Sequence, residues 1–153
     1  MATAQAGDSD MASRIARHRA ERPAHWLTVE EPLALSERVA ALAGHADAVL
    51  VDCVTLWTAN LMLRGDGDAD IVGAADALIA VVGRRLFDVT LITNEVGQGV
   101  VPATAEGVRF RDLLGFVNQR LAAACDHVTL MVAGLPVTIK TPSPGHDLSL
   151  QTA

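Results

Sequence analysis

Short apolar runs, separated by longer helical stretches, constrain the fold more than any other feature of the sequence. The first three are Val49–Val54, Val89–Thr93 and Val128–Ala133, and each is rich in β-branched residues. Val137–Lys140 is a candidate fourth run. Nearly continuous apolar runs of this length are typical of strands that a parallel sheet buries on both faces. We therefore expect them to form the strands of a mostly parallel sheet.

The stretches between these runs have the apolar periodicity and the boundary residues of helices. One helix is expected to begin with Asp8, Ser9 or Asp10 as its cap and to end near Ala20, before Arg22-Pro23. The other predicted helices are Leu33–Ala43, Ile71–Phe87 and Phe110–Ala124, and Arg64–Asp70 is predicted to be a Gly/Asp turn. Strands that alternate with helices predict an α/β fold in which helices flank the sheet.

Charge and hydropathy argue against nucleic-acid binding and against a membrane span. The chain has 18 acidic and 12 basic residues, a net charge of −6 and few aromatic residues, which disfavours nucleic-acid binding. The longest apolar stretches are interrupted by Asp52 and Asp76, so no membrane span is predicted. The first ten residues lack the pattern of a signal peptide, and we expect a cytoplasmic protein.

The length of 153 residues corresponds to one domain. Residues 141–153 are rich in Pro, Ser and Gly and show no periodicity, which predicts a mobile tail after a domain spanning residues 1–140. Cys53 and Cys125 lie in apolar surroundings without a CxxC spacing. We interpret them as packing residues in a reducing compartment, with redox or metal chemistry as the alternative.

Polar residues follow two of the predicted strands. Asp52 stands at the end of the first run, and Asn94 and Glu95 begin the loop Thr93–Pro102 after the second. In open α/β sheets, ligands bind at the carboxyl ends of the strands. An ordinary turn residue remains the alternative for Asp52, and an ordinary turn with a helix cap remains the alternative for the loop.

A histidine lies among arginines in the first predicted helix. His18 has Arg17 and Arg19 as its neighbours, and Arg22 follows. Such positive charge attracts phosphates and favours the neutral, nucleophilic form of the imidazole. The spacing alone leaves a second interpretation open, namely an exposed histidine at a solvated helix end.

Taken together, these segments resemble one enzyme family. The blocks RIARHRAERPAHW, TVEEP, VLVDCVTLWTANLML, TNEVGQGVVP and FRDLLGFVNQRLAAACDHVTLMVAGLPVTIK occur in the family's order and spacing. They resemble the bifunctional adenosylcobinamide kinase / adenosylcobinamide-phosphate guanylyltransferase of cobalamin synthesis, from about Ala2 to Lys140. The resemblance implies a P-loop NTPase fold of the RecA-like type and a homo-oligomer.

The resemblance also implies an activity. A nucleoside triphosphate, ATP or GTP, phosphorylates adenosylcobinamide with the help of Mg²⁺. GMP then passes from GTP to adenosylcobinamide phosphate through a GMP-histidine intermediate, which gives adenosylcobinamide-GDP.

Individual positions take their implied roles from the same resemblance. His18 matches the histidine that is guanylylated, and Asp52 matches the acid of a Walker-B-like strand that holds Mg²⁺ directly or through water. Apart from the resemblance, Asn94 and Glu95 are candidates, by their position after a predicted strand, for a loop that contacts the substrate or its phosphates. The implied nucleotide-binding positions are Thr3, Ala4, Gln5, Arg19, Ala20, Glu21, Arg22, Asp52, and one or both of Glu30 and Glu31.

The sequence departs from the family pattern at two places. Family members begin with a strand and a GxxxxGK[ST] phosphate loop, but this pattern is absent from the 153 residues, whose single lysine is Lys140. Loss of a central first strand would leave unpaired sheet edges, so we expect the true start to lie upstream of Met1. The alternatives are that the chain is a fragment or that neighbouring strands close the gap. The family also has an arginine where this chain has Val108, and Arg109 is a candidate substitute.

Two other hypotheses remain open at this point. One is a non-catalytic nucleotide-binding or subunit-contact module that has the same fold. The other is an inactive fragment that does not fold alone.

Overall fold

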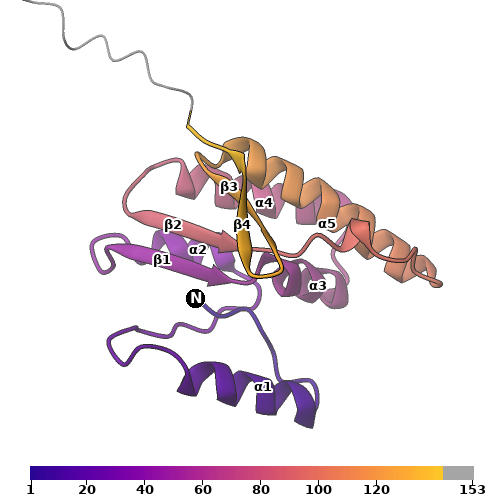
Figure 1. Cartoon of the computed structure of the whole chain (residues 1–153), viewed down its shortest axis with the longest axis horizontal. Helices are drawn as coiled ribbons and strands as arrows, with labels where there is room; N and C mark the ends of the chain where they lie inside the picture. Colours follow the sequence, from indigo (N-terminus) through magenta and orange to yellow (C-terminus); the bar gives the residue numbers. More distant parts are fainter. Residues whose placement is uncertain (143–153) are drawn as a thin grey trace, which may run out of the picture.

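Two parallel strands form the centre of the fold. The computed structural model describes residues 1–142, which form an α/β arrangement of five α-helices and four strands (Figure 1). β1 (Ala48–Asp52) pairs in parallel with β2 (Asp88–Ile92), and Val49 lies opposite Val89. The predicted parallel pairing of the first two runs is confirmed. The predicted tail lies outside the described residues, apart from residues 141 and 142.

The N-terminal residues extend this parallel arrangement on the far side of β1. Ala2 forms parallel bridges with both Asp52 and Glu30. The amide of Asp52 donates to the carbonyl of Met1 at 3.0 Å, and the amide of Ala2 donates to the carbonyl of Val29 at 2.8 Å. The N-terminal residues, the segment around Glu30 and the end of β1 therefore lie side by side, although they are far apart in the sequence.

The other edge of β2 is open in the described part of the chain. The amide of Asp88 donates toward β1, to the carbonyl of Asp47 at 3.3 Å, so the alternation of a parallel ladder directs the backbone groups of Val89 and Leu91 away from β1. No strand among residues 1–142 pairs with that edge. Within residues 1–142, the parallel strand pair therefore ends at β2.

The last two predicted strands form a hairpin, so the expectation of a mostly parallel sheet is wrong for them. β3 (Val128–Val132) and β4 (Leu135–Lys140) pair antiparallel as a separate two-stranded sheet. Parallel strands need a crossover of roughly a dozen residues, whereas Ala133-Gly134 alone joins these two. Both turn residues have positive φ, 51° and 80°, as in tight hairpin turns.

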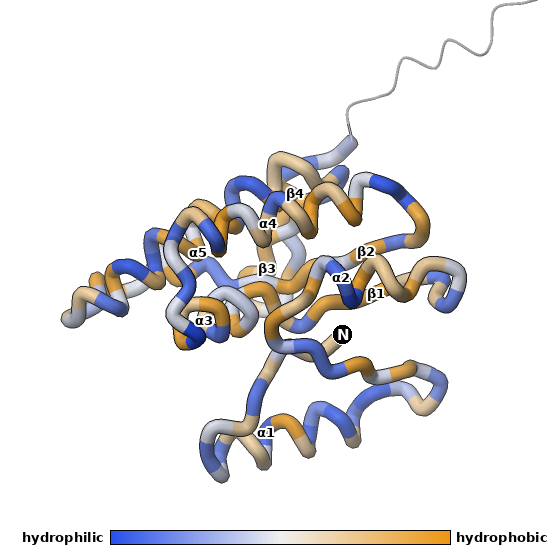
Figure 2. The backbone as a smooth tube through the Cα atoms, turned by 180° about the vertical axis from the view of Figure 1, so that it is seen from behind, coloured by the Kyte–Doolittle hydropathy of each residue, from blue (hydrophilic) through white to orange (hydrophobic). Residues whose placement is uncertain are grey.

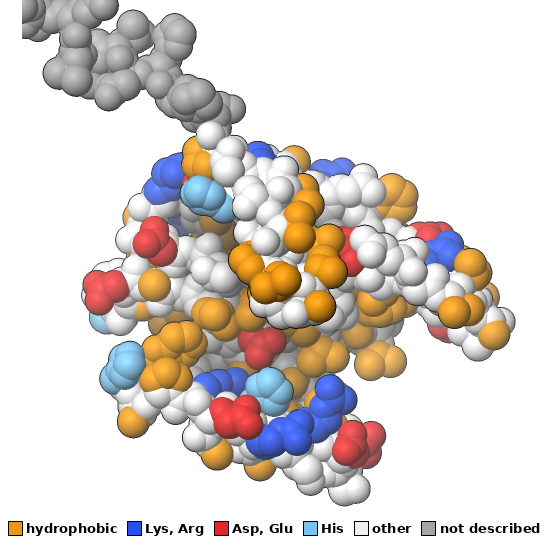
Figure 3. All heavy atoms as spheres, viewed as in Figure 1, with side chains coloured by type: hydrophobic (Ala, Val, Ile, Leu, Met, Phe, Trp, Pro, Cys, Tyr) orange, Lys and Arg blue, Asp and Glu red, His pale blue; other side chains and the backbone are white. Residues whose placement is uncertain are grey.

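The prediction that the sheet buries both faces of the strands is also wrong for most of them. β1 buries Val49 and Val51, but β2 alternates between exposed and half-buried side chains. On the hairpin, Met131 is 60% exposed and Ile139 is 62% exposed. Apolar side chains gather on the hairpin in the space-filling view (Figure 3).

The structure contains the four predicted helices and one further helix. The observed helices are α1 (Ser9–Ala20), α2 (Leu35–Ala40), α3 (Val54–Arg64), α4 (Asp68–Val82) and α5 (Ala105–Ala124), and a 3₁₀ turn, η1, spans Val96–Gln98. α2 is shorter than predicted, while α4 and α5 begin earlier than predicted. The predicted turn at residues 64–70 therefore contains the start of α4.

The helix that the sequence analysis missed is α3, which begins directly after β1. Cys53 is its N-cap, and the Cys53 Sγ accepts from the amide of Leu56 at 3.4 Å. The apolar run continues without a break from the strand into the helix, so the expected strand end at Val54 is two residues too late. Gly65, at φ 99°, ends the helix in the left-handed conformation that glycine favours.

The core lies between one face of the strand pair and helices α2 to α5. Its fully buried members include Leu35, Val51, Trp57, Leu61, Ile71, Leu78 and Val117. Helix α1 buries no residue and lies apart from the other helices, across the strand pair from α4 and α5 (Figures 1 and 2). The chain thus places one amphipathic helix over the carboxyl end of β1 without packing it into the core.

Candidate functional site

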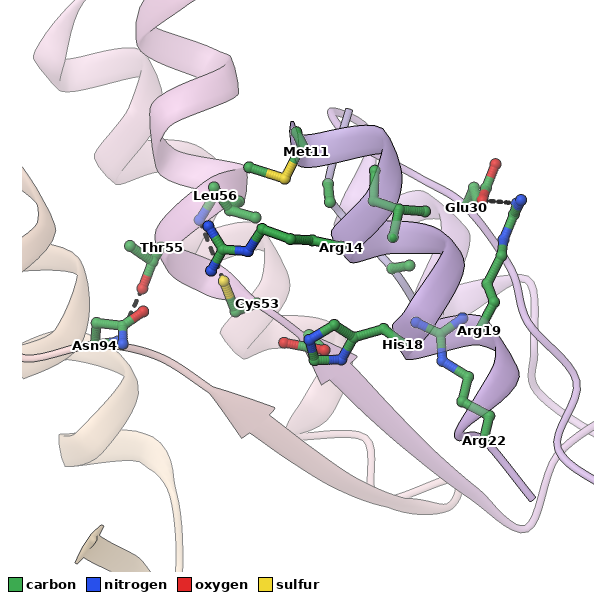
Figure 4. Close-up of a pocket in the computed structure, with 14 residues that line it drawn as sticks. Met11, Arg14, His18, Arg19, Arg22, Glu30, Cys53, Thr55, Leu56 and Asn94 are labelled. Atoms are coloured by element: carbon green, nitrogen blue, oxygen red, sulfur yellow. Dashed lines mark hydrogen bonds and ion pairs between the residues drawn. The ribbon is translucent and has the colours of Figure 1, made fainter. Parts of the chain in front are cut away.

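A cavity of about 280 Å³ lies between α1 and the carboxyl end of β1 (Figure 4). Its wall includes His18 from α1, Asp52 from the end of β1, and Asn94 from the loop after β2. These residues come from the three segments that the sequence analysis singled out. The structure brings the three motifs together at one site.

One face of α1 lines this cavity. The helix begins at the N-cap Asp8, whose carboxylate accepts from the amide of Met11 at 2.8 Å. Side chains three and four positions apart share a helix face. The lining residues follow that spacing: Met11, Arg14, Ile15, His18, Arg19 and, just beyond the helix, Arg22.

The charges around the cavity favour an anionic ligand. Three guanidinium groups and one imidazole line it, against the carboxylates of Glu30 and Asp52. Arg19 forms an ion pair with Glu30, and Arg22 donates to the hydroxyl of Thr28 at 3.1 Å. Basic side chains gather along α1 beside a hollow in the molecular surface (Figure 3). Guanidinium groups bind phosphate oxygens through paired N–H donors, so phosphate is a well-suited ligand.

Asp52 is held at the cavity by a buried network around Thr3. The Thr3 hydroxyl donates to the carbonyl of Cys53 at 2.7 Å and accepts from its amide at 2.9 Å. Asn60 donates to the carbonyl of Thr3 at 2.8 Å and to that of Pro32 at 3.1 Å. The strand end that carries Asp52 is therefore fixed to the N-terminal segment and to α3. The Asp52 carboxylate itself makes no hydrogen bond or ion pair with any residue in 1–142.

The loop after β2 is fixed by an asparagine that the sequence analysis missed. Asn118, on α5, is 9% exposed and accepts from the Thr93 hydroxyl at 2.7 Å. Its amide donates to the carbonyl of Asn94 at 3.1 Å and to the carboxylate of Glu95 at 3.0 Å. The amide of Asn94 in turn donates to the hydroxyl of Thr55 at 2.8 Å. A polar residue within the apolar stripe of Phe110–Ala124 is the signal that could have revealed it.

We expect replacement of Asn118 by alanine to lower the free energy of unfolding by about 1–3 kcal/mol, because buried partners lose their hydrogen bonds. Amide hydrogen exchange at residues 93–95 should accelerate as the loop loosens. Replacement of the exposed neighbour Gln119 by alanine is the control and should change neither quantity. Equal stability and equal exchange for the two variants would show that Asn118 does not hold the loop.

Comparison with known proteins shows which family the chain is similar to. The family model described as cobinamide kinase / cobinamide phosphate guanyltransferase matches residues 1–139. The bifunctional adenosylcobalamin biosynthesis protein CobP of Pseudomonas aeruginosa is 46% identical over 140 residues, which cover 92% of this chain and 80% of the relative. The corresponding CobU proteins of Escherichia coli and Salmonella typhimurium are each 41% identical over 152 residues, covering 92% of this chain and 84% of each relative.

The chain belongs to the cobinamide kinase / cobinamide phosphate guanyltransferase family. The resemblance stated from the sequence is confirmed, and a role in cobalamin biosynthesis follows from the curated relatives. The roles of individual residues in this family member remain predictions, and the structure reports where each of them lies.

The two adjacent acids of the family's acidic segment have different surroundings. Glu30 lines the cavity and pairs with Arg19. The Glu31 carboxylate accepts from the amides of Leu33 and Ala34, at 2.9 and 2.7 Å, just before α2 begins. Of these two carboxylates, that of Glu30 therefore lies at the cavity, where it is paired with Arg19.

Some of the other expected nucleotide-binding residues line the cavity and others do not. Ala4, Arg19 and Arg22 line the cavity, whereas Gln5, Ala20 and Glu21 are solvent-exposed residues outside its lining. The side chain of Thr3 is fully buried in its network. Glu95 lies outside the lining and takes part in the Asn118 network.

Arg109 is engaged away from the cavity. Its guanidinium donates to the Asp68 carboxylate at 2.7 Å and to the carbonyl of Asp66 at 2.9 Å. These contacts tie the start of α5 to the turn before α4. Arg109 therefore has a structural contact in place of the phosphate contact considered for it.

Both cysteines are at least partly buried, and Cys53 also lines the cavity. Cys53 is buried at the start of α3, and Cys125 is half-buried at the end of α5. Burial raises the pKa of the Cys125 thiol, which keeps it in its less reactive protonated form. Within residues 1–142, no three His, Cys, Asp or Glu side chains gather as metal ligands. No helix in that range has the length and apolar character that crossing a membrane requires.

Proposed function

We propose that this protein transfers GMP from GTP to adenosylcobinamide phosphate through a guanylylated His18, after phosphorylating adenosylcobinamide with ATP or GTP. The observation that carries the proposal is the position of His18 on the arginine-lined wall of the cavity at the carboxyl end of β1. We further propose that the protein acts in the cytoplasm as a homo-oligomer.

In the proposed transfer, a nitrogen of the neutral imidazole attacks the α-phosphorus of GTP. A P–N bond forms, the bond from that phosphorus to the bridging oxygen breaks, and pyrophosphate leaves with the electron pair. An oxygen of adenosylcobinamide phosphate then attacks the same phosphorus, the P–N bond breaks, and adenosylcobinamide-GDP is released with His18 regenerated. The covalent intermediate divides one difficult transfer into two easier ones.

Asp52 suits the Mg²⁺ that accompanies nucleotide phosphates. Its half-buried carboxylate faces the cavity and is unpaired among the described residues. Mg²⁺ typically binds one or two carboxylates together with substrate phosphates and water, so a single acid here fits that ion. When bound, it would neutralise phosphate charge. In the kinase step, we assign to Asn94 and Glu95 the positioning of the loop beside the phosphates.

Incubation with GTP labelled at the α-phosphorus tests the proposal. We expect the protein to take up label that is stable to base and labile to acid, as a phosphoramidate is, and to release one pyrophosphate for each label. Addition of adenosylcobinamide phosphate should discharge the label as adenosylcobinamide-GDP. Reversible guanine-nucleotide binding without covalent label would instead support the non-catalytic module.

A further inference from the structure

Arg14 lies one helical turn before His18 on the same face of α1. Residues four positions apart on a helix are neighbours on its surface, and both line the cavity. In Figure 4 the Arg14 side chain extends along the cavity toward Leu56 and Cys53, at the start of α3. Arg14 and His18 therefore line the same cavity, and the guanidinium lies near the start of α3.

Arg14 differs from the other two arginines of the cavity in having no partner. Arg19 is neutralised by Glu30, and Arg22 donates to Thr28. Within residues 1–142, Arg14 makes no hydrogen bond or ion pair. Its donors and its positive charge are thus available to a ligand.

The position of Arg14 has no evident structural purpose. Helix α1 buries none of its residues, so the guanidinium is not needed to complete a packed interface. Arg17, on the same helix, is exposed like Arg14 but does not line the cavity. Arg14 therefore faces the cavity while Arg17 does not, and of the arginines that line the cavity Arg14 is the one without a partner among residues 1–142.

We propose that Arg14 is a catalytic residue of the guanylyl transfer, which binds the phosphates that leave as pyrophosphate. This inference rests on the proposed function of His18. As the P–N bond to His18 forms and the bond to the bridging oxygen breaks, negative charge develops on the departing pyrophosphate. Arg14 donates paired N–H bonds to those oxygens and keeps its own proton throughout, while the imidazole gives the proton of its other nitrogen to solvent.

The geometry of the guanidinium makes a specific prediction about substitutions. A planar fork can bind two phosphate oxygens at once, whereas a lysine ammonium supplies the charge without the fork. We therefore expect R14A to lower the rate of His18 labelling at saturating GTP by about 100-fold or more. We expect R14K to recover part of that loss, because it restores the charge.

The test compares R14A and R14K with R17A, a matched arginine on the same helix. Single-turnover labelling over a range of GTP concentrations separates the rate constant from the apparent affinity, and GMP binding is measured alongside. R17A should label at the parent rate. GMP lacks the leaving phosphates, so its affinity should be the same in all four proteins, and circular dichroism should show equal helix content.

The outcomes separate this inference from the proposed function. If the parent labels and R14A labels as fast as R17A, the role of Arg14 is overturned while that of His18 stands. If R14A weakens GMP binding as much as it slows labelling, the residue serves nucleotide binding in general, which also contradicts the inference. If the parent takes no label, the proposed function is overturned, and the role of Arg14 with it.

Discussion

A protein in which His18 is replaced by asparagine should take no covalent guanylyl label and should transfer GMP about 1,000-fold more slowly or worse. Asparagine keeps a polar side chain of similar reach but has no nitrogen lone pair that can attack phosphorus. Because His18 is exposed on a helix with no buried residue, its loss should leave the fold intact. The measurement is label incorporation per chain, with helix content followed by circular dichroism.

The matched control for this experiment is His25→Asn. His25 is also exposed and lies seven residues further along, but it is outside the lining of the His18 cavity. We expect it to label at the parent rate. Equal labelling of the His18 variant and the parent would show that another residue is the nucleophile.

The largest expected effect on stability follows replacement of Trp57 by alanine, which should lower the free energy of unfolding by about 3–5 kcal/mol. Trp57 is 1% exposed within the core, and its indole N–H donates to the carbonyl of Leu33 at 2.8 Å. The substitution removes the largest buried side chain and leaves that carbonyl unpaired. Since domains are stable by roughly 5–15 kcal/mol, the variant should be close to unfolding.

The chain offers its other tryptophan as the control. Trp26 is 49% exposed, and we expect its replacement by alanine to change the stability by about 0.5 kcal/mol or less. Urea denaturation followed by far-ultraviolet circular dichroism measures both variants without relying on tryptophan fluorescence. Similar midpoints for the two variants would contradict the assignment of the core to the α3 side of the sheet.

Sequence reasoning located the strands because their residue types differ sharply from those around them, but it did not give the orientation of every pair. For Val89–Thr93 the chain preceding it is long enough for a helical crossover, so the parallel prediction was correct. For the last two runs the decisive signal was the length of the connection. The two residues Ala133-Gly134 are too few for a crossover. This signal is missed when the runs are judged by their apolar character alone.

The missed helix has a similar physical explanation. Val51 and Val54 are both fully buried, one in a strand and the other in a helix, so hydropathy does not change where the element changes. The boundary is set by Cys53, whose thiol caps α3 although cysteine is not among the usual capping residues. A boundary made by such a residue is invisible to pattern reasoning.

For the site, the sequence predicted which segments converge but not which side chains face the cavity. His18, Asp52 and Asn94 line one cavity, because the end of β1 and the loop after β2 both lie beside helix α1. The side chains of Thr3 and Glu31, by contrast, form hydrogen bonds with backbone groups. For Thr3 the partner lies 50 residues away in sequence. Spacing along the chain carries no information about such contacts.

The central claim, that His18 carries GMP, is tested most directly by locating the adduct on the chain. Cleavage after Glu21 and after Glu30 separates His18 from His25, because each resulting segment holds one histidine. The digest is kept at neutral or alkaline pH and read by mass spectrometry. The proposal predicts the mass of one GMP residue on the segment that ends at Glu21. A GMP adduct on the segment from Arg22 to Glu30, or on neither segment of a labelled protein, would contradict it.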